Sequence, residues 1–250
     1  MPTPTTNHPR PFHVIRLVTL LVAFATLGSI ATAQIDDRAR ELLAGLQPTT
    51  VDTIETLDQT TVMTLDAQGG TEVRSRTVID YAGRRARIDT EVAPGMSATI
   101  VVADGQMQMI VSGMTVPLPP ELGEQFGDIF AGDPNDPLAG IESASFDGAV
   151  SYADVVSGDQ VTVRGEARVA GLDQGEATRF VFGDAGGLLA VVSDSSEGTM
   201  AMVFDEPVAG SPAVGRNAVL YRLQGSDAER IATIRYEDVR INEPLADDLF

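Results

Sequence analysis

The sequence predicts a mainly β protein built around an antiparallel sheet with one apolar face. Residues 71–112 carry this prediction, because apolar and polar side chains alternate there and glycine-containing turns interrupt the alternation. Within Thr71–Tyr81, Val73 and Ile79 fall on one side of a period of two, whereas Arg74 and Arg76 fall on the other. An apolar sheet face must be covered by another layer. Two short amphipathic segments elsewhere in the chain are the candidates for that layer.

The chain begins with the pattern of a secretory signal peptide. Two arginines precede an uncharged apolar run, and small residues follow it up to Ala33. We expect residues 1–33 to be removed by cleavage between Ala33 and Gln34, which leaves residues 34–250 as one exported domain in the periplasm or cell envelope. The alternative is a membrane anchor, but the uncharged segment is at the short limit for a spanning helix. No cysteine is present to accept a lipid, so we expect a soluble mature protein.

Composition excludes several classes of function. Removal of the signal peptide leaves 15 arginines against 36 acidic residues, a formal charge of −21 that opposes binding to nucleic acid or to an anionic membrane surface. The mature chain has no histidine, cysteine or lysine. It therefore cannot build a Ser-His-Asp or Cys-His site, a Schiff base, a Walker A loop or a His/Cys zinc site. A carboxylate-pair hydrolase and an oxygen-ligand metal site remain open.

Two features are weak candidates for those remaining chemistries. Residues 132–137 (GDPNDP) could ligate calcium, but the two prolines and the lack of a spaced glutamate favour an ordinary turn. The adjacent acids Asp36-Asp37 and Asp247-Asp248 lie near a helix start and near the C-terminus, and Asp36 is interpreted as a helix N-cap. We therefore predict a protein that is not an enzyme and uses neither a cofactor nor a metal ion.

The first half of the mature chain is predicted to contain two helices and five strands. Residues 35–46 form a short amphipathic helix, and residues 49–66 form one long or bent strand. Four strands follow within residues 71–112. Their turns are predicted at Ala82-Gly83, Pro94-Gly95 and Asp104-Gly105.

The second helix follows a proline-rich break at residues 117–120. Residues 121–130 space apolar side chains at helical intervals, and their two glycines make the helix dependent on a surface to lie on. Strands then resume and continue to the end of the chain. They are predicted at residues 149–156, 160–170, 177–182, 188–193, 199–204, 217–223 and 230–241.

The end of the chain resembles the outer-membrane lipoprotein carrier family, LolA/LolB-like. The order of residues within Ile231–Phe250 carries the resemblance, namely Tyr236, Asn242, Pro244, Asp248, Leu249 and Phe250. Gly83–Ile88 and the Asp104-Gly105 hairpin are similar to turns of that family. The sequence departs from the family at Tyr81-Ala82, where the family has Arg-Pro. An arginine gate can therefore not be carried over to this chain.

The resemblance implies a curved antiparallel half-barrel of about ten to eleven strands, with helices over its concave face and acyl chains between sheet and helices. It implies a monomeric, exported carrier of lipid or acylated lipoprotein that exchanges cargo with membrane-bound donor and acceptor proteins. The alternative is a non-enzymatic envelope scaffold or sensor of the same fold with a closed core. An exported glycosidase is a more distant alternative, because aromatic residues make up only 5% of the chain.

Apolar residues of the sheet and of the second helix are the candidate lipid-binding residues. Methionine in particular adapts to irregular apolar ligands, although the same methionines could fill a closed core. The candidate lining consists of Met63, Leu65, Val73, Ile79, Tyr81, Ile88, Ile100, Val102, Met107, Met109, Leu122, Phe126 and Phe130.

Overall fold

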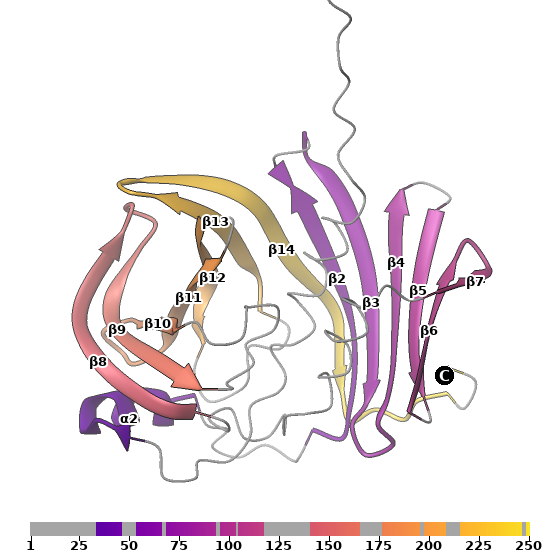
Figure 1. Ribbon diagram of the computed structural model, residues 1–250, viewed down its shortest axis with the longest axis horizontal. Helices are drawn as coiled ribbons and strands as arrows, with labels where there is room; N and C mark the ends of the chain where they lie inside the picture. The colour runs from indigo at the N-terminus through magenta and orange to yellow at the C-terminus, as the bar shows by residue number, and fades with distance from the viewer. Residues whose placement is uncertain are drawn as a thin grey trace, which may run out of the picture.

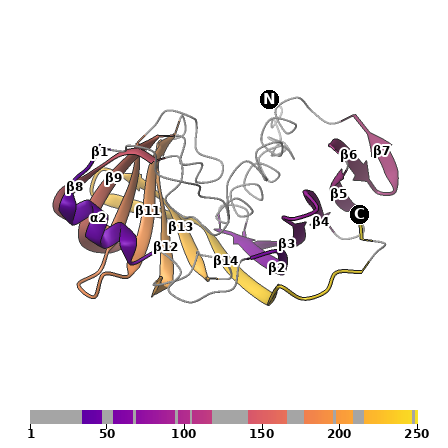
Figure 2. The same cartoon turned by 90° about the horizontal axis from the view of Figure 1, so that it is seen from below.

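The strands of this protein form one strongly curved sheet. The structure is a computed structural model that describes residues 34–46, 54–66, 69–93, 96–103, 105–117, 141–165, 177–195, 198–208, 216–246 and 249–250. Figures 1 and 2 show that the sheet bends along its whole width and stays open at its two edges. The predicted mainly β, curved antiparallel architecture is confirmed. The described residues include no helix with the length and apolar content needed to cross a membrane.

Several predictions fall on other parts of the chain. The signal peptide, the helix at residues 121–130, the calcium-loop candidate at residues 132–137 and the pair Asp247-Asp248 all lie outside the described residues.

Two meanders build the sheet and meet in its middle. The first runs through β2 (Thr56–Leu65), β3 (Thr71–Asp80), β4 (Arg85–Ala93), β5 (Met96–Ala103), β6 (Gln106–Val111) and β7 (Met114–Val116). The second runs through β8 (Ile141–Tyr152), β9 (Val156–Gly165), β10 (Thr178–Phe182), β11 (Leu188–Ser195), β12 (Gly198–Val208), β13 (Ala218–Gln224) and β14 (Asp227–Ile241). Strand β14 pairs antiparallel with β2 and so joins the two meanders.

The first described element lies at the far edge of the second meander. Strand β1 (Gln34–Ile35) pairs in parallel with β8, and α2 (Asp37–Ala44) follows it directly. The Asp36 side chain accepts a hydrogen bond from the Ala39 backbone N–H at 2.7 Å, as predicted for an N-cap. The hydrogen bonds from Ala39 and Phe146 to its carboxylate hold the pKa of Asp36 below its usual range.

The predicted strand number was too low. The described residues contain fourteen strands, thirteen of them in antiparallel pairs, rather than ten to eleven. Strands β1 and β7 have two and three residues, too few for an alternating pattern to appear. Strand β8 starts at Ile141 instead of residue 149, because two register shifts and the small residues Ala144 and Gly148 hide its period of two.

Buried apolar residues form two clusters on the concave face of the sheet. The main core cluster joins both meanders to α2, which contributes Ala39, Leu42, Leu43 and the following Leu46. The second cluster lies on the first meander and is formed by Leu57, Ile79, Ala86, Ile88, Ile100 and Val102. Met63 of the main core cluster and Leu57 of the second cluster lie six positions apart in the unbroken strand β2, so both clusters occupy the same face.

Candidate lipid-binding face

Strand register places all charged residues of the first meander on one face. Leu57 pairs with Ile79, Ile79 with Ala86, and Ala86 with Val102, so these apolar side chains share the concave face. The charged residues of β2, β3 and β4 occupy the intervening positions. The concave-facing positions of β2 to β6 therefore hold no charged side chain among the described residues.

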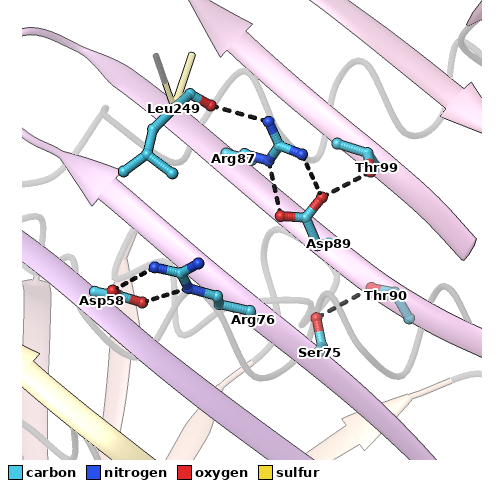
Figure 3. A network of polar contacts seen from close by, with 8 residues as sticks. All are labelled: Asp58, Ser75, Arg76, Arg87, Asp89, Thr90, Thr99 and Leu249. Atoms are coloured by element: carbon cyan, nitrogen blue, oxygen red, sulfur yellow. Dashed lines mark hydrogen bonds and ion pairs between the residues drawn. The ribbon is translucent and has the colours of Figure 1, made fainter. Parts of the chain in front are cut away.

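Ion pairs join neighbouring charges on the opposite, convex face (Figure 3). Arg76 donates to both Asp58 carboxylate oxygens, at 2.9 and 2.7 Å, and Arg87 donates to Asp89 at 2.7 and 3.0 Å. Thr99 also donates to Asp89, at 2.7 Å. Burial raises the pKa of Asp89, but the hydrogen bonds from Arg87 and Thr99 outweigh it and hold the pKa below its usual range.

The C-terminal segment lies against this convex face. In Figure 2 the chain after β14 runs outside β2, β3 and β4. Arg87 donates to the backbone oxygen of Leu249 at 3.1 Å, and the Arg85 guanidinium stacks 4.6 Å from the centroid of the Phe250 ring.

Asn242, which directly follows β14, connects the end of this strand to the start of β2 by hydrogen bonds. Its side-chain oxygen accepts from the backbone N–H of Glu55 at 2.7 Å and of Thr56 at 3.3 Å. Its φ of 58° is a left-handed conformation that asparagine tolerates. Asn242, Leu249 and Phe250 thus shape the sheet from its end and from its convex side, away from the apolar concave face.

Seven of the predicted lining residues come together in the second cluster. Ile79, Ile88, Ile100 and Val102 are buried members of it, and the half-buried Tyr81, Met107 and Met109 pack against it. Leu57 and Ala86 complete the cluster and were not among the predicted residues. Met63, Leu65 and Val73 lie instead in the main core cluster, and Leu122, Phe126 and Phe130 lie outside the described residues.

The second cluster becomes more accessible towards the free edge of the sheet. Exposure rises from 0% at Ile79 to 3% at Ile88 and 7% at Ile100. The next strand, β6, contributes Met107 and Met109, which are half-buried. The apolar surface is therefore sealed in the middle of the sheet and open at β6, where flexible methionine side chains line it.

A belt of polar residues, absent from the predicted lining, separates the two clusters on the concave face. Its members are Gln59, Thr61, Ser75, Thr77 and Thr90, and all but the half-buried Thr90 are buried. The Ser75 and Thr90 hydroxyls hydrogen-bond across strands at 3.0 Å (Figure 3). The threonine-rich sequence of β2 was the available signal, but alternation alone did not show that Gln59 and Thr61 face inward.

Two buried side-chain oxygens of this face have no hydrogen-bond partner in the described part of the chain. They are the side-chain oxygen of Gln59, a residue that is 3% exposed, and the hydroxyl of Tyr81. Burying such a group unpaired costs about 1–3 kcal/mol. Burial also raises the pKa of Tyr81 above its ordinary range, which keeps its hydroxyl neutral.

Comparison with known proteins gives a structural likeness and no family assignment. No family model matches the sequence, and no curated protein is significantly similar to it. A crystal structure of a LolA superfamily protein from Nitrosomonas europaea superposes with a TM-score of 0.48 at 12% identity, covering 85% of this chain and 96% of that one. A likeness at this level carries no conclusion about what this chain binds. Among the described residues, no group of three or more acidic side chains is placed to hold a metal ion.

Proposed function

We propose that this protein is an exported, non-enzymatic carrier that binds lipid or lipoprotein acyl chains against the concave face of its sheet. The observation that carries the proposal is the second cluster, an uncharged apolar surface that opens at Met107 and Met109. Charged side chains of the same strands lie on the opposite face, where Arg76 pairs with Asp58 and Arg87 with Asp89. This division gives a polar exterior and an apolar surface that a lipid can reach.

The energetics of lipid transfer favour such a division. Removing an acyl chain of about sixteen carbons from water is favourable by roughly 10 kcal/mol, at about 0.8 kcal/mol per methylene. A bilayer offers nearly the same stabilisation. A carrier must therefore match the bilayer in apolar contact while its outer surface remains hydrated. Membrane-bound donor and acceptor proteins would then supply the cargo and take it over from a monomeric carrier.

Native mass spectrometry of the purified protein tests this proposal. We expect a bound species of lipid mass that dissociates on collisional activation, and saturable binding of a fluorescent fatty acid by the delipidated protein. Protein that carries no lipid and binds no fatty acid would instead favour the scaffold or sensor with a closed core.

A further inference from the structure

We propose that Met107 and Met109 form an oxidation site that controls the lipid-binding face: a peroxide converts their thioethers to sulfoxides and thereby abolishes lipid binding. This inference rests on the proposed carrier function and adds to it a regulation of the same face by oxidants.

Methionine is concentrated at the free edge of the first meander. The chain has eight methionines, and subtracting the one in the predicted signal peptide leaves seven. Four of these seven, Met96, Met107, Met109 and Met114, lie on β5, β6 and β7, the strands that end the sheet at this edge (Figure 1). The chain has no cysteine, so methionine carries the only sulfur that an oxidant can attack.

Strand register turns these four side chains towards the concave face. Met107 and Met109 lie opposite buried members of the second cluster. Met114 lies opposite the residue two positions after Met109. Met96 comes four positions before Ile100 in the unbroken strand β5, and side chains an even number of positions apart share a face. The free edge therefore presents four thioethers on the face that is proposed to bind lipid.

The methionines differ in how far solvent reaches them. Met114 is 67% exposed and Met96 is 50% exposed, and each begins a strand after a turn. Met107 and Met109 are half-buried. The two buried methionines of the main core cluster are only 2% and 6% exposed. A peroxide in solution should therefore oxidise the two strand starts first, the lipid-binding face next and the core last.

The reaction changes the chemistry of the apolar surface. The thioether sulfur attacks one oxygen of hydrogen peroxide, so that an S–O bond forms and the O–O bond breaks. The second oxygen takes up the proton of the first and leaves as water. Sulfur loses two electrons and the peroxide gains them. The sulfoxide is polar where methionine was apolar, and its oxygen accepts hydrogen bonds.

The position of each sulfoxide decides its effect on lipid binding. At Met107 and Met109 the new oxygen is hydrated from the open side of β6 in the free protein, but a bound acyl chain would strip that water away. At Met96 and Met114 the exposed sulfoxide stays in water whether or not lipid is bound. Oxidation at β6 should therefore weaken lipid binding, whereas oxidation at the two strand starts should leave it unchanged.

Bound cargo should protect the same two methionines. An acyl chain that packs on Met107 and Met109 covers the sulfur atoms that a peroxide must reach. The carrier would then be open to inactivation when it is empty and resistant when it is loaded. Met96 and Met114 should react equally fast in both states.

Peroxide treatment of the purified, delipidated protein tests the inference. Samples are taken over time, the peroxide is removed with catalase, and each sample is analysed by peptide mass spectrometry and by titration with a dansyl-labelled undecanoic acid. Affinity should remain constant while Met96 and Met114 are oxidised. It should then fall at least about tenfold as Met107 and Met109 are oxidised. Saturating laurate, added before the peroxide, should slow the oxidation of Met107 and Met109 several-fold.

Leucine variants connect the loss of affinity to particular sulfur atoms. The double variant Met107→Leu/Met109→Leu keeps an apolar surface without sulfur, so it should bind the probe before and after treatment. The matched control Met96→Leu/Met114→Leu should lose affinity on oxidation as the wild type does. If the first variant does not fold, protection of the wild type by laurate still decides.

Three results would overturn the inference. They are full affinity after complete oxidation of Met107 and Met109, loss of affinity in the treated Met107→Leu/Met109→Leu variant, and oxidation of the two residues at the same rate with and without laurate. Failure of the untreated wild type to bind the probe would instead reject the carrier function itself.

Discussion

Replacement of Met109 by glutamate distinguishes between two hypotheses, an accessible lipid-binding surface and a closed core. Met109 lies on β6, pairs with Ile100 and Val116, and is half-buried against the second cluster. Full burial of a methionine side chain stabilises a fold by about 1.5–3 kcal/mol. Loss of a half-buried one should therefore lower the free energy of unfolding by about 1–1.5 kcal/mol. At about 2–4 °C per kcal/mol for a chain of this size, the melting temperature should fall by about 2–6 °C.

The effect on lipid binding should be much larger. In the free protein, water reaches the new carboxylate from the open side of β6. A bound acyl chain would strip that water away at a cost of several kcal/mol, so the affinity for a fatty acid should fall at least about 100-fold.

Gln108→Glu is the matched control, because Gln108 is the exposed neighbour on the opposite face of the same strand. Fluorescent fatty-acid titration and thermal melting are measured on the wild type and both variants. We expect Gln108→Glu to bind as the wild type does. Equal binding by Met109→Glu and Gln108→Glu would refute a ligand path over β6. An unfolded Met109→Glu, together with a wild type that binds no probe, would decide for the closed core.

Three further predictions concern stability and processing. Asn242→Ala should lower the free energy of unfolding by about 2–3 kcal/mol in urea titrations. Two backbone N–H groups lose their acceptor in this variant, and alanine tolerates the left-handed conformation poorly. Asn242→Asp keeps the acceptor, so its free energy of unfolding should stay near that of the wild type. The pKa of Asp89 in the folded state lies below its ordinary value of 3.8, so its contribution to stability is complete above that value and is lost as the pH falls below it. Melting temperatures measured from pH 7 to pH 3 should therefore decline most steeply below about pH 4, and Asp89→Asn should flatten that decline. N-terminal sequencing of exported protein should begin at Gln34, the first residue of β1, whereas a retained apolar run would indicate an anchored protein.

Alternation of side chains predicted the first meander well. Strand β3 falls within the predicted Thr71–Tyr81, because its charged and apolar residues alternate cleanly and one face is buried. The same alternation grouped Ile79, Ile88 and Met109 correctly, since neighbouring antiparallel strands place equivalent positions side by side. Strand β8 was predicted poorly because its register shifts break the period of two.

The polar belt could not be predicted, for a different reason. Gln59 and Thr61 have the composition of solvent-facing residues, and only pairing with β3 and β14 shows that they face the interior. The partner strand β14 is far away in the sequence, and no local pattern in β2 indicates that the two strands pair. Positions whose environment is set by distant strands are therefore the ones that sequence reasoning assigns least well.

The pairing of β14 with β2 also governs how the chain can fold. Ile234 pairs with Met63 across roughly 170 residues of sequence, so the middle of the sheet is the last part that a growing chain can assemble. Until β14 is available, β2 and β13 each present an unpaired strand edge, which is a template for aggregation. Long-range pairing of this kind slows folding. We expect a chain that ends before β14 to have no stable first half, because the strand that completes its sheet is the last one to be synthesised.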